Sequence, residues 1–383
     1  MTDLGVIPTP VLYFCIFYKK KEAGVMITGS HNPPEHNGFK MMSGEDSLAG
    51  PDIQEIYGII KDGKFAGGAG VRTDYDLVPE YQEYIRANVK ISGTLRIVVD
   101  AGNGTGGVVA VPVFRALGFD VVELYCEMDG HFPNHHPDPT LPDAMKDLVA
   151  KVAETGADLG IAYDGDADRI GVVDDKGQII WGDQLMVVFA RDILASRPGA
   201  TVISEVKASK VLYDEIERLG GKPVMWKTGH SLIKKKIKES KAVLAGEMSG
   251  HIFFADRWFG FDDAIYASLR LLEILSKSKT KLSAMLADLP KTFSTPEIRI
   301  YASDEVKFRI VDEVRKDLAA RHPVIDIDGV RALFPKGWGL VRASNTQALL
   351  VLRFEGETRE DLEAIQKEVR GVLQKVIGRL NSH

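Results

Sequence analysis

The sequence predicts an α/β protein whose doubly wound sheets are followed by a small α+β domain. Short apolar, β-branched segments alternate with Gly- and Asp-rich turns and with segments of helical periodicity. Such alternation is typical of parallel strands joined by helices. The chain of 383 residues is long enough for about two to four domains, at roughly 100–200 residues each. Ligands gather at the carboxyl ends of strands in these sheets, so polar segments that follow strands are the candidate sites.

The strands are predicted from apolar runs that end in polar turns. One such unit covers residues 95–107, LRIVVDAGNGTGG, and residues 157–175 have the pattern of a strand, a turn and a second strand. Two further segments repeat the strand-then-turn form, and helices are expected between the strands. These further strand segments are 200–209 and 241–254, and the expected helices are 141–154, 184–195 and 262–275.

Three changes of composition indicate domain boundaries. Residues 63–74 are glycine-rich and linker-like, residues 174–183 form a predicted hairpin, and residues 289–300 precede a different pattern. That pattern is a strand, a helix over 305–321, several strands up to residue 353 and a helix over 359–380. We therefore expect four domains, at residues 1–75, 76–178, 179–289 and 290–383.

Composition excludes several classes of protein. The net charge of -6 argues against a general nucleic-acid binder, which carries a basic excess. Cys15 and Cys126 are the two cysteines, too few for a disulfide framework, which indicates a reducing compartment. No apolar run approaches the roughly 20 residues that span a bilayer. The lysines at 19–21 follow the apolar run 11–18 instead of preceding it as in a secretory signal. We expect a cytoplasmic protein with neither nucleic-acid nor membrane partners.

The segment DGDADR, residues 164–169, is the sharpest chemical signal. Asp164, Asp166 and Asp168 alternate in a turn between two predicted strands, and a looped backbone can direct three carboxylates at one centre. Ligands that are all oxygen favour a hard cation such as Mg²⁺. An EF-hand is disfavoured because its required glycine and glutamate are replaced by Arg169 and Asp175. The alternative is a solvated acidic turn.

The segment GNGTGG, residues 102–107, matches the G-x-G-x-x-G fingerprint of dinucleotide sites. It follows a predicted strand, and Glu123 lies about 20 residues further on, as that fold requires. A nucleotide-dependent oxidoreductase is therefore a competing hypothesis. The alternative is a tight strand-to-helix turn whose glycines adopt positive φ angles. The oxidoreductase hypothesis leaves the other motifs unexplained.

Two further polar turns suit a sugar and a phosphate. In GEMSGH, residues 246–251, a carboxylate (Glu247) and a hydroxyl (Ser249) could bind a vicinal diol, although Ser249 could equally cap a helix. RASNTQ, residues 342–347, offers a guanidinium, hydroxyls and an amide, which is how a phosphate is held. The alternative there is a polar hairpin turn. The phosphate-binding candidates are Arg342, Ser344, Asn345 and Thr346.

The segment TGSHNPPEHNGFK, residues 28–40, places Ser30 before a histidine. A hydrolase elbow needs G-x-S-x-G, and the residues flanking Ser30 do not provide it. A Ser-His-Asp triad stays open on sequence grounds. Lys40, Lys207 and His230 lie in similar polar segments, where they are either solvated or act as proton shuttles and phosphate partners.

With TGSHNP, DGDADR, GEMSGH and RASNTQ in this order, the chain from about Gly5 onward resembles the α-D-phosphohexomutase family, and within it the bacterial phosphomannomutase/phosphoglucomutase branch. The resemblance implies three related α/β domains with mixed sheets and a C-terminal α+β domain, heart-shaped around a central cleft. It implies that Ser30 is phosphorylated and binds Mg²⁺ together with Asp164, Asp166 and Asp168.

The resemblance also implies the remaining roles. The reaction would transfer a phosphoryl group between the 1- and 6-positions of mannose or glucose phosphates, through a hexose 1,6-bisphosphate, in a monomer or weak dimer. Met248 in the sugar loop favours these sugars over glucosamine. Glu247 and Ser249 would bind sugar hydroxyls, and the 342–346 loop would hold the phosphate that is not reacting. Catalytic positions would be Ser30, His31, Lys40, Arg169 and His230, and further substrate-binding positions would be Asn32, Lys207 and His251.

The start of the chain departs from the family pattern. In the family a longer segment precedes the serine loop, with an opening strand and an arginine-bearing substrate loop, whereas Ser30 here lies close to Met1. We expect an incomplete first domain with an exposed sheet edge and apolar surface. Weak activity is a consequence to expect, and a non-catalytic sugar-phosphate binder is the alternative function.

Overall fold

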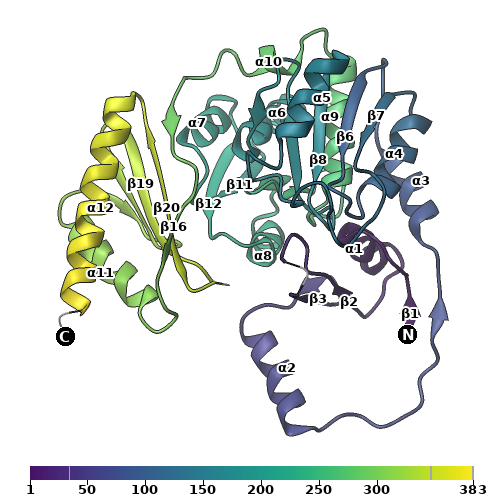
Figure 1. The fold of residues 1–383 in the computed structure, drawn as a ribbon, viewed down its shortest axis with the longest axis horizontal. Helices are drawn as coiled ribbons and strands as arrows, with labels where there is room; N and C mark the ends of the chain where they lie inside the picture. Colours follow the sequence, from purple (N-terminus) through teal and green to yellow (C-terminus); the bar gives the residue numbers. More distant parts are fainter. Residues whose placement is uncertain (34, 346, 382–383) are drawn as a thin grey trace. The chain divides into compact units, whose positions relative to one another are not determined.

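The computed structural model describes residues 1–33, 35–345 and 347–381 (Figure 1). Its contacts divide the chain into two units. The first consists of residues 1–204, 212–224 and 229–288, and the second of residues 205–211, 225–228 and 289–383. Each unit is described by itself below. The predicted boundaries of four domains stay a prediction.

The N-terminal part of the first unit holds a buried helix and a small antiparallel sheet. Helix α1 (Thr9–Tyr18) is apolar on all sides, as expected of a buried helix. Strands β2 (Ala23–Ile27), β3 (Phe39–Ser43) and β4 (Asp46–Ser47) pair in that order. Strand β1 (Thr2–Asp3) pairs with β5 (Thr73–Asp74), and the residues of helix α2 (Pro51–Asp62) are all exposed or only partly buried.

Strand β2 is an edge strand with an exposed apolar face. Its Gly24 faces Leu12 and Ile16 of α1, so the alternate side chains point away from the helix. Val25 and Ile27 are accordingly 55% and 67% exposed. Among the described residues, strand β2 thus leaves one edge of this small sheet unpaired and an apolar face exposed.

The next sheet of the first unit is mixed. Its order is β10-β9-β8-β6-β7, with β6, β7 and β8 parallel and β9 and β10 antiparallel. The predicted strand–turn–strand at 157–175 is confirmed. The strands are β6 (Arg96–Asp100), β7 (Asp120–Leu124), β8 (Leu159–Tyr163), β9 (Ile170–Val173) and β10 (Ile179–Ile180), with helices α3 (Val78–Asn88), α4 (Gly107–Ala116) and α5 (Lys146–Thr155).

Helix α5 begins at Lys146, five residues later than the prediction of a helix over 141–154. The residues before it form successive turns, in which Leu141, Ala144 and Met145 donate their amide hydrogens to carbonyls three residues earlier. Leu148 and Val152 of α5 then pack on Val98 of the sheet. Packing against the sheet therefore stabilises α5, and the turns before Lys146 determine where it begins.

A second sheet of this region has the order β12-β11-β13-β14, with β11 and β13 parallel and β13 and β14 antiparallel. The predicted helices at 184–195 and 262–275 correspond to α6 and α9, and Asp263 caps α9 by accepting the Tyr266 amide hydrogen at 2.8 Å. The elements are α6 (Gly182–Ser196), β11 (Thr201–Glu205), α7 (Lys210–Arg218), β12 (Lys222–Trp226), α8 (His230–Ser240), β13 (Leu244–Gly246), β14 (Ile252–Phe254), α9 (Ala264–Lys277) and α10 (Leu282–Met285).

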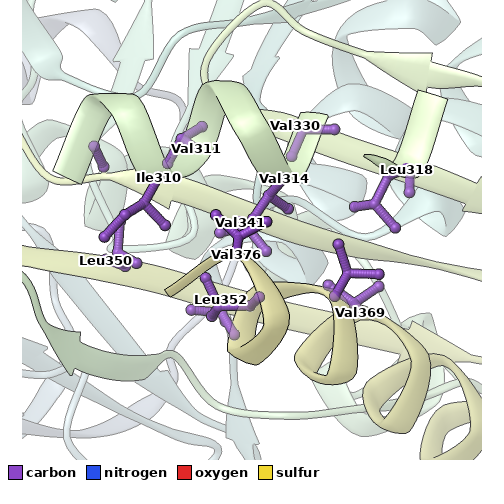
Figure 2. Packing of buried hydrophobic residues seen from close by; sticks show 14 of the residues in the cluster. Ile310, Val311, Val314, Leu318, Val330, Val341, Leu350, Leu352, Val369 and Val376 are labelled. Atoms are coloured by element: carbon purple, nitrogen blue, oxygen red, sulfur yellow. The ribbon is translucent and has the colours of Figure 1, made fainter. Parts of the chain in front are cut away.

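The second unit is the predicted α+β tail, and its core is formed between an antiparallel sheet and two helices. Val314 of α11 and Val369 and Val376 of α12 pack toward Val341 and Leu352 of the sheet (Figure 2). The elements are β15 (Phe293–Ser294), β16 (Ile298–Tyr301), α11 (Lys307–Ala319), β17 (Val324–Ile325), β18 (Val330–Phe334), β19 (Gly337–Ala343), β20 (Leu349–Gly356) and α12 (Arg359–Asn381). Among the described residues of both units, helices long and apolar enough to cross a membrane are absent.

Candidate active site

The serine loop, residues 28–38, joins β2 to β3. The Thr28 amide hydrogen is donated to the Gly38 carbonyl at 3.0 Å, which closes the loop at its base. The Ser30 amide hydrogen is donated to Thr28 Oγ1 at 2.8 Å. Ser30 itself has a φ of 50°, a left-handed conformation that is uncommon for a serine and clusters at functional sites. The loop thus presents Ser30 in a strained, fixed position.

The aspartate turn, residues 164–169, joins β8 to β9 and meets the serine loop. Asp164 Oδ1 accepts the amide hydrogens of Asp168 and Arg169 at 3.1 and 3.0 Å, which curls the turn. Carboxylate oxygens of Asp164, Asp166 and Asp168 lie within 4.8 Å of one another. Ser30 donates its hydroxyl hydrogen to Asp164 Oδ2 at 2.8 Å. The predicted convergence of the three aspartates is therefore found, with Ser30 beside them.

A lysine and a threonine also reach this cluster. Lys40 Nζ lies 2.6 Å from Asp166 Oδ2 and 2.5 Å from Asp168 Oδ2. Thr9 donates its hydroxyl hydrogen to Asp166 Oδ2 at 2.6 Å. Burial opposes the charge of Lys40, but the two carboxylates outweigh it and raise the pKa of Lys40 well above its usual value. The lysine therefore stays cationic inside the site.

The cluster fits a hard divalent cation. Asp166 Oδ1 is buried and accepts no hydrogen bond from the part of the chain that is described. Burial, followed by the charges of Asp168 and Asp166, raises the pKa of Asp164 well above its usual value. A cation would give Asp166 Oδ1 a partner and would relieve the repulsion among the three carboxylates. The all-oxygen donor set suits Mg²⁺.

The turn between β13 and β14, residues 247–251, is linked to the aspartate turn through His251. Its Nδ1 lies 2.7 Å from Glu247 Oε2, and its Nε2 lies 3.1 Å from Asp168 Oδ1. Arg169 Nε lies 3.2 Å from the same Nε2. Glu247 Oε1 accepts the Gly229 amide hydrogen at 2.7 Å. The turn also holds Ser249, which is partly buried.

Burial lowers the pKa of His251, but the charge of Asp168 and the hydrogen bonds to Asp168 and Glu247 outweigh it and raise that pKa to about 9. Burial opposes the ionisation of Asp168, but the charges of Lys40 and His251 outweigh it and keep the pKa of Asp168 well below its usual value. Asp168 is therefore held as a carboxylate between two cations.

His230 begins helix α8 and lies beside a buried carboxylate. Its Nδ1 lies 3.4 Å from Asp262 Oδ2, while Lys234 Nζ lies 3.0 Å from Asp262 Oδ1. Lys234 Nζ also lies 4.0 Å from the centre of the Tyr13 ring. Burial and the charge of Lys234 lower the pKa of His230, so the imidazole is neutral and can accept a proton near neutral pH.

Sequence reasoning missed these supporting residues. Asp262 is predicted only as the start of a helix, Tyr13 lies in the apolar run 11–18, and Thr9 lies just before that run. The sequence offers one local signal of Asp262. Two aspartates, Asp262 and Asp263, precede the apolar helix, whereas a helix cap needs only one of them.

His31 and Asn32 follow Ser30 but face different surroundings. His31 Nδ1 lies 3.2 Å from Asp138 Oδ2, in a loop that sequence reasoning did not single out. Asn32 lines a cavity of about 290 Å³ together with Ser30 and Asp166. The serine thus borders a space that a small molecule can enter.

The glycine motif at 102–107 has a packing role. A Cβ on Gly104 would lie 2.6 Å from the Gly165 carbonyl oxygen, and one on Gly107 would lie 2.8 Å from Cys126. Thr105 donates its amide hydrogen to the Gly165 carbonyl at 3.0 Å. Close backbone approach explains these glycines without a nucleotide, and the dinucleotide hypothesis is not favoured.

In the second unit, the predicted phosphate loop joins β19 to β20. Arg342 Nε donates to Asp328 Oδ2 at 3.0 Å, and Ser344 Oγ accepts the Gln347 amide hydrogen at 3.1 Å. Asn345 is exposed, and Thr346 lies outside the described residues. Lys207, also of this unit, is buried with its Nζ 2.5 Å from Glu297 Oε1. Arg342, Ser344 and Asn345 thus lie close together in the sequence, at the end of β19 and directly after it.

Four family models match the chain in sequence order. They describe phosphoglucomutase/phosphomannomutase α/β/α domain I at residues 1–67, domain II at 79–177, domain III at 181–293 and the C-terminal domain at 297–372. The matches together cover most of the chain.

Individual relatives agree with these matches. A phosphomannomutase/phosphoglucomutase of Pseudomonas aeruginosa is 49% identical over 98% of this chain and 81% of its own length, and a phosphoglucomutase of Neisseria meningitidis is 47% identical over 97% and 82%. A solved phosphoglucomutase/phosphomannomutase family protein of Burkholderia thailandensis has a TM-score of 0.91 at 43% identity, over 98% and 82% of the two chains. The Aspergillus fumigatus N-acetylphosphoglucosamine mutase, solved with GlcNAc-6P and magnesium, shares the fold at TM-score 0.67 and 17% identity, over 96% and 92%.

Proposed function

Because this chain belongs to the phosphoglucomutase/phosphomannomutase family, we propose that Ser30 carries the phosphoryl group that it transfers between the 1- and 6-positions of a hexose phosphate. The chain is an isomerase that acts by phosphoryl transfer on hexose phosphates. The observation that carries the assignment to Ser30 is its 2.8 Å hydrogen bond to Asp164, inside the aspartate cluster. Mannose and glucose phosphates are the proposed substrates.

We propose that Asp164, Asp166 and Asp168, with the phosphate on Ser30, hold Mg²⁺. When bound, the ion neutralises charge on the phosphoryl oxygens. The fit of the carboxylates described above supports this assignment. Lys40 and Arg169 add positive charge beside the same group, since phosphoryl transfer depends mainly on positioning and charge neutralisation.

The transfer breaks the bond between phosphorus and Ser30 Oγ and forms one between phosphorus and a sugar hydroxyl oxygen. The net proton movement is from that hydroxyl to Ser30 Oγ, and we assign His230 as the group that accepts the proton first, because its pKa is lowered. The product is a hexose 1,6-bisphosphate. After this intermediate turns around, its other phosphoryl group returns to Ser30, which completes the cycle.

Binding is assigned to the other loops. Glu247, Ser249 and His251 bind sugar hydroxyls, and the second unit holds the phosphate that is not reacting through Arg342 and its neighbours Ser344, Asn345 and Thr346. Asn32 and Lys207 complete the substrate contacts, and His31 supports the serine loop.

Water must be excluded while the intermediate turns, because hydrolysis of the phosphoserine would end the cycle. Cys15 and Cys126 are both buried free thiols, which supports the proposal of a cytoplasmic enzyme. The proposal of a monomer or weak dimer rests on the family resemblance alone.

The test is to follow the phosphate. Mass spectrometry of the purified protein, incubated with glucose 1,6-bisphosphate, should find phosphate on Ser30. Ser30→Ala should lose most of the mutase activity, while Ser43→Ala, at an exposed position in β3, should keep it. Full turnover by Ser30→Ala, or phosphate on another residue, would refute the assignment.

A further inference from the structure

A second group of possible metal ligands lies beside the serine loop, apart from the aspartate cluster. His31, His136 and Asp138 each offer a ligand atom, and these atoms lie within 4.8 Å of one another. We propose that these three residues bind Zn²⁺, and that Zn²⁺ bound there inhibits turnover by tying the serine loop to the loop that carries His136. The inhibition rests on the proposed function of Ser30, whereas the binding does not.

The loop geometry prepares Asp138 as a ligand. Its Oδ1 accepts the Thr140 amide hydrogen at 3.0 Å and the Thr140 hydroxyl hydrogen at 2.7 Å. Its Oδ2 faces His31 Nδ1 at 3.2 Å. Burial opposes ionisation of Asp138, but His31, Thr140 and Arg169 outweigh it and lower its pKa below the usual value. One oxygen is thus anchored and the other is a charged acceptor directed at the imidazole.

Two neighbouring histidines of this loop have different surroundings. His135 points inward, with its Nε2 3.1 Å from both carboxylate oxygens of Asp100. His136 instead stands at the exposed rim of the cluster, its ring centre 6.0 Å from that of His31. A neutral imidazole has a nitrogen lone pair to donate to a metal ion, so His136 can act as a ligand from this rim.

The ligand set distinguishes zinc from magnesium. Two imidazoles and one carboxylate are a ligand set typical of Zn²⁺ sites that keep a fourth position open, whereas oxygen-only ligands suit Mg²⁺. Tetrahedral Zn²⁺ with bonds of about 2.0–2.1 Å needs ligand atoms roughly 3.3 Å apart. His31 and Asp138 already meet that spacing at 3.2 Å. His136 is exposed, so a change of its side-chain torsions can bring it in.

Zinc at this site would act on catalysis through His31. The residue is adjacent to Ser30, and the serine loop must accept a phosphate and release it in each cycle. A bond from His31 to a metal held also by the 136–138 loop would fix the serine loop in one position. Inhibition should therefore persist when Mg²⁺ saturates the aspartate cluster.

The binding experiment uses the full chain in excess Mg²⁺ and measures Zn²⁺ by competition with a chromogenic chelator. One tight site per chain is expected. His136→Gln and Asp138→Asn should each weaken it by at least about tenfold, while His131→Gln should not, because His131 is 95% exposed and lies in the same segment outside the cluster. Co²⁺ in place of zinc should give the visible absorption of a tetrahedral site in the wild type and in His131→Gln, but not in His136→Gln or Asp138→Asn. Thermal melts show whether Asp138→Asn is folded.

Equal zinc affinity in all variants, or displacement of Zn²⁺ by Mg²⁺, would place the ion at the aspartates and overturn the proposal. The activity arm compares inhibition of the wild type and His136→Gln by Zn²⁺. Loss of inhibition in the variant is expected, and equal inhibition would contradict the regulatory role. If Ser30 is not the phosphate carrier, the Ser30→Ala assay reports that failure and the chelator measurement still decides on the site.

Discussion

Ser30 Oγ lies 2.8 Å from Asp164 Oδ2, although the two residues are 134 positions apart in the sequence. A Cβ on the neighbouring Gly165 would lie 2.3 Å from the Ser30 carbonyl oxygen. Such proximity leaves room only for glycine at this position, so the serine loop and the aspartate turn meet backbone to backbone. A group carried on Ser30 is thereby held within reach of three carboxylates.

Asp164→Asn should lower kcat/KM by on the order of 10²-fold, the usual cost of losing one group that stabilises charge in the transition state. It should also raise the Mg²⁺ concentration that gives half-maximal activity, because one anionic ligand is lost. Steady-state assays over a Mg²⁺ titration measure both effects. Asp143→Asn, at a side chain that is 87% exposed, is the matched control. An unchanged Mg²⁺ requirement in Asp164→Asn would contradict the ligand assignment.

Lys40→Met should destabilise the protein most strongly in the absence of divalent cations. The substitution leaves Asp166 and Asp168 without their shared cation, and breaking such a buried pair costs about 3–5 kcal/mol. Mg²⁺ should restore part of the loss, so the difference in Tm from the wild type should shrink as Mg²⁺ is added. Melts of Lys64→Met, whose side chain is 82% exposed, should match the wild type in both conditions. A Tm gap that Mg²⁺ does not change would argue against a cation among these carboxylates.

The stability of the first unit should depend on pH through Asp263. Burial raises the pKa of Asp263 to about 7, although hydrogen bonds from the Tyr266 amide and Tyr81 hydroxyl oppose it. The folded state therefore binds a proton that the unfolded state releases between about pH 4 and pH 7. This contribution makes stability fall as pH rises through that window, by on the order of 4 kcal/mol, and level off above it.

Asp263→Asn keeps the cap of α9 and removes the titration, so its stability should vary less between pH 4 and pH 7 than that of the wild type. Denaturant unfolding at several pH values measures the difference. Parallel pH profiles of the two proteins would show that Asp263 is ionised in the folded state throughout.

Leu318→Ala should loosen the second unit alone. Leu318 of α11 is fully buried in the core that this helix shares with the sheet, and such truncations cost about 2–5 kcal/mol. Hydrogen exchange should accelerate in residues 307–319 and 359–381 and stay unchanged in β6 and β8 of the first unit. Phe308→Ala, at a position of α11 that is 53% exposed, should change neither. Faster exchange across both units would mean that they unfold together.

The aspartate turn could be predicted because its strands and its three carboxylates are contiguous in the sequence. The residues that contact this turn from other parts of the chain could not be predicted. Thr9 donates to Asp166 although the two residues are 157 positions apart. The sequence around either residue does not indicate this contact. The start of α5 was missed for a different reason: turns before Lys146 compete with the helix for the same amide hydrogens.

The roles at the serine loop came from a family resemblance, and the residues alone left a triad open. The structure shows a different surrounding: the histidine after Ser30 faces Asp138, whereas the Ser30 hydroxyl faces Asp164. Lys207 and Arg342, which are predicted to bind substrate, both pair with carboxylates of their own unit, Glu297 and Asp328 respectively. Contacts of this kind follow from tertiary packing and have no period or motif in the sequence.

The position of His251 between Asp168 and Glu247 has a thermodynamic consequence. If the proposed roles hold, a cation bound by Asp168 and a sugar bound by Glu247 would both alter the hydrogen bonds of one ring, so the two equilibria would be linked. Linkage is reciprocal: the factor by which the ion changes sugar affinity equals the factor by which the sugar changes ion affinity. A substitution that loosens this ring should therefore reduce the effect of the ion on sugar affinity and the effect of the sugar on ion affinity by the same factor.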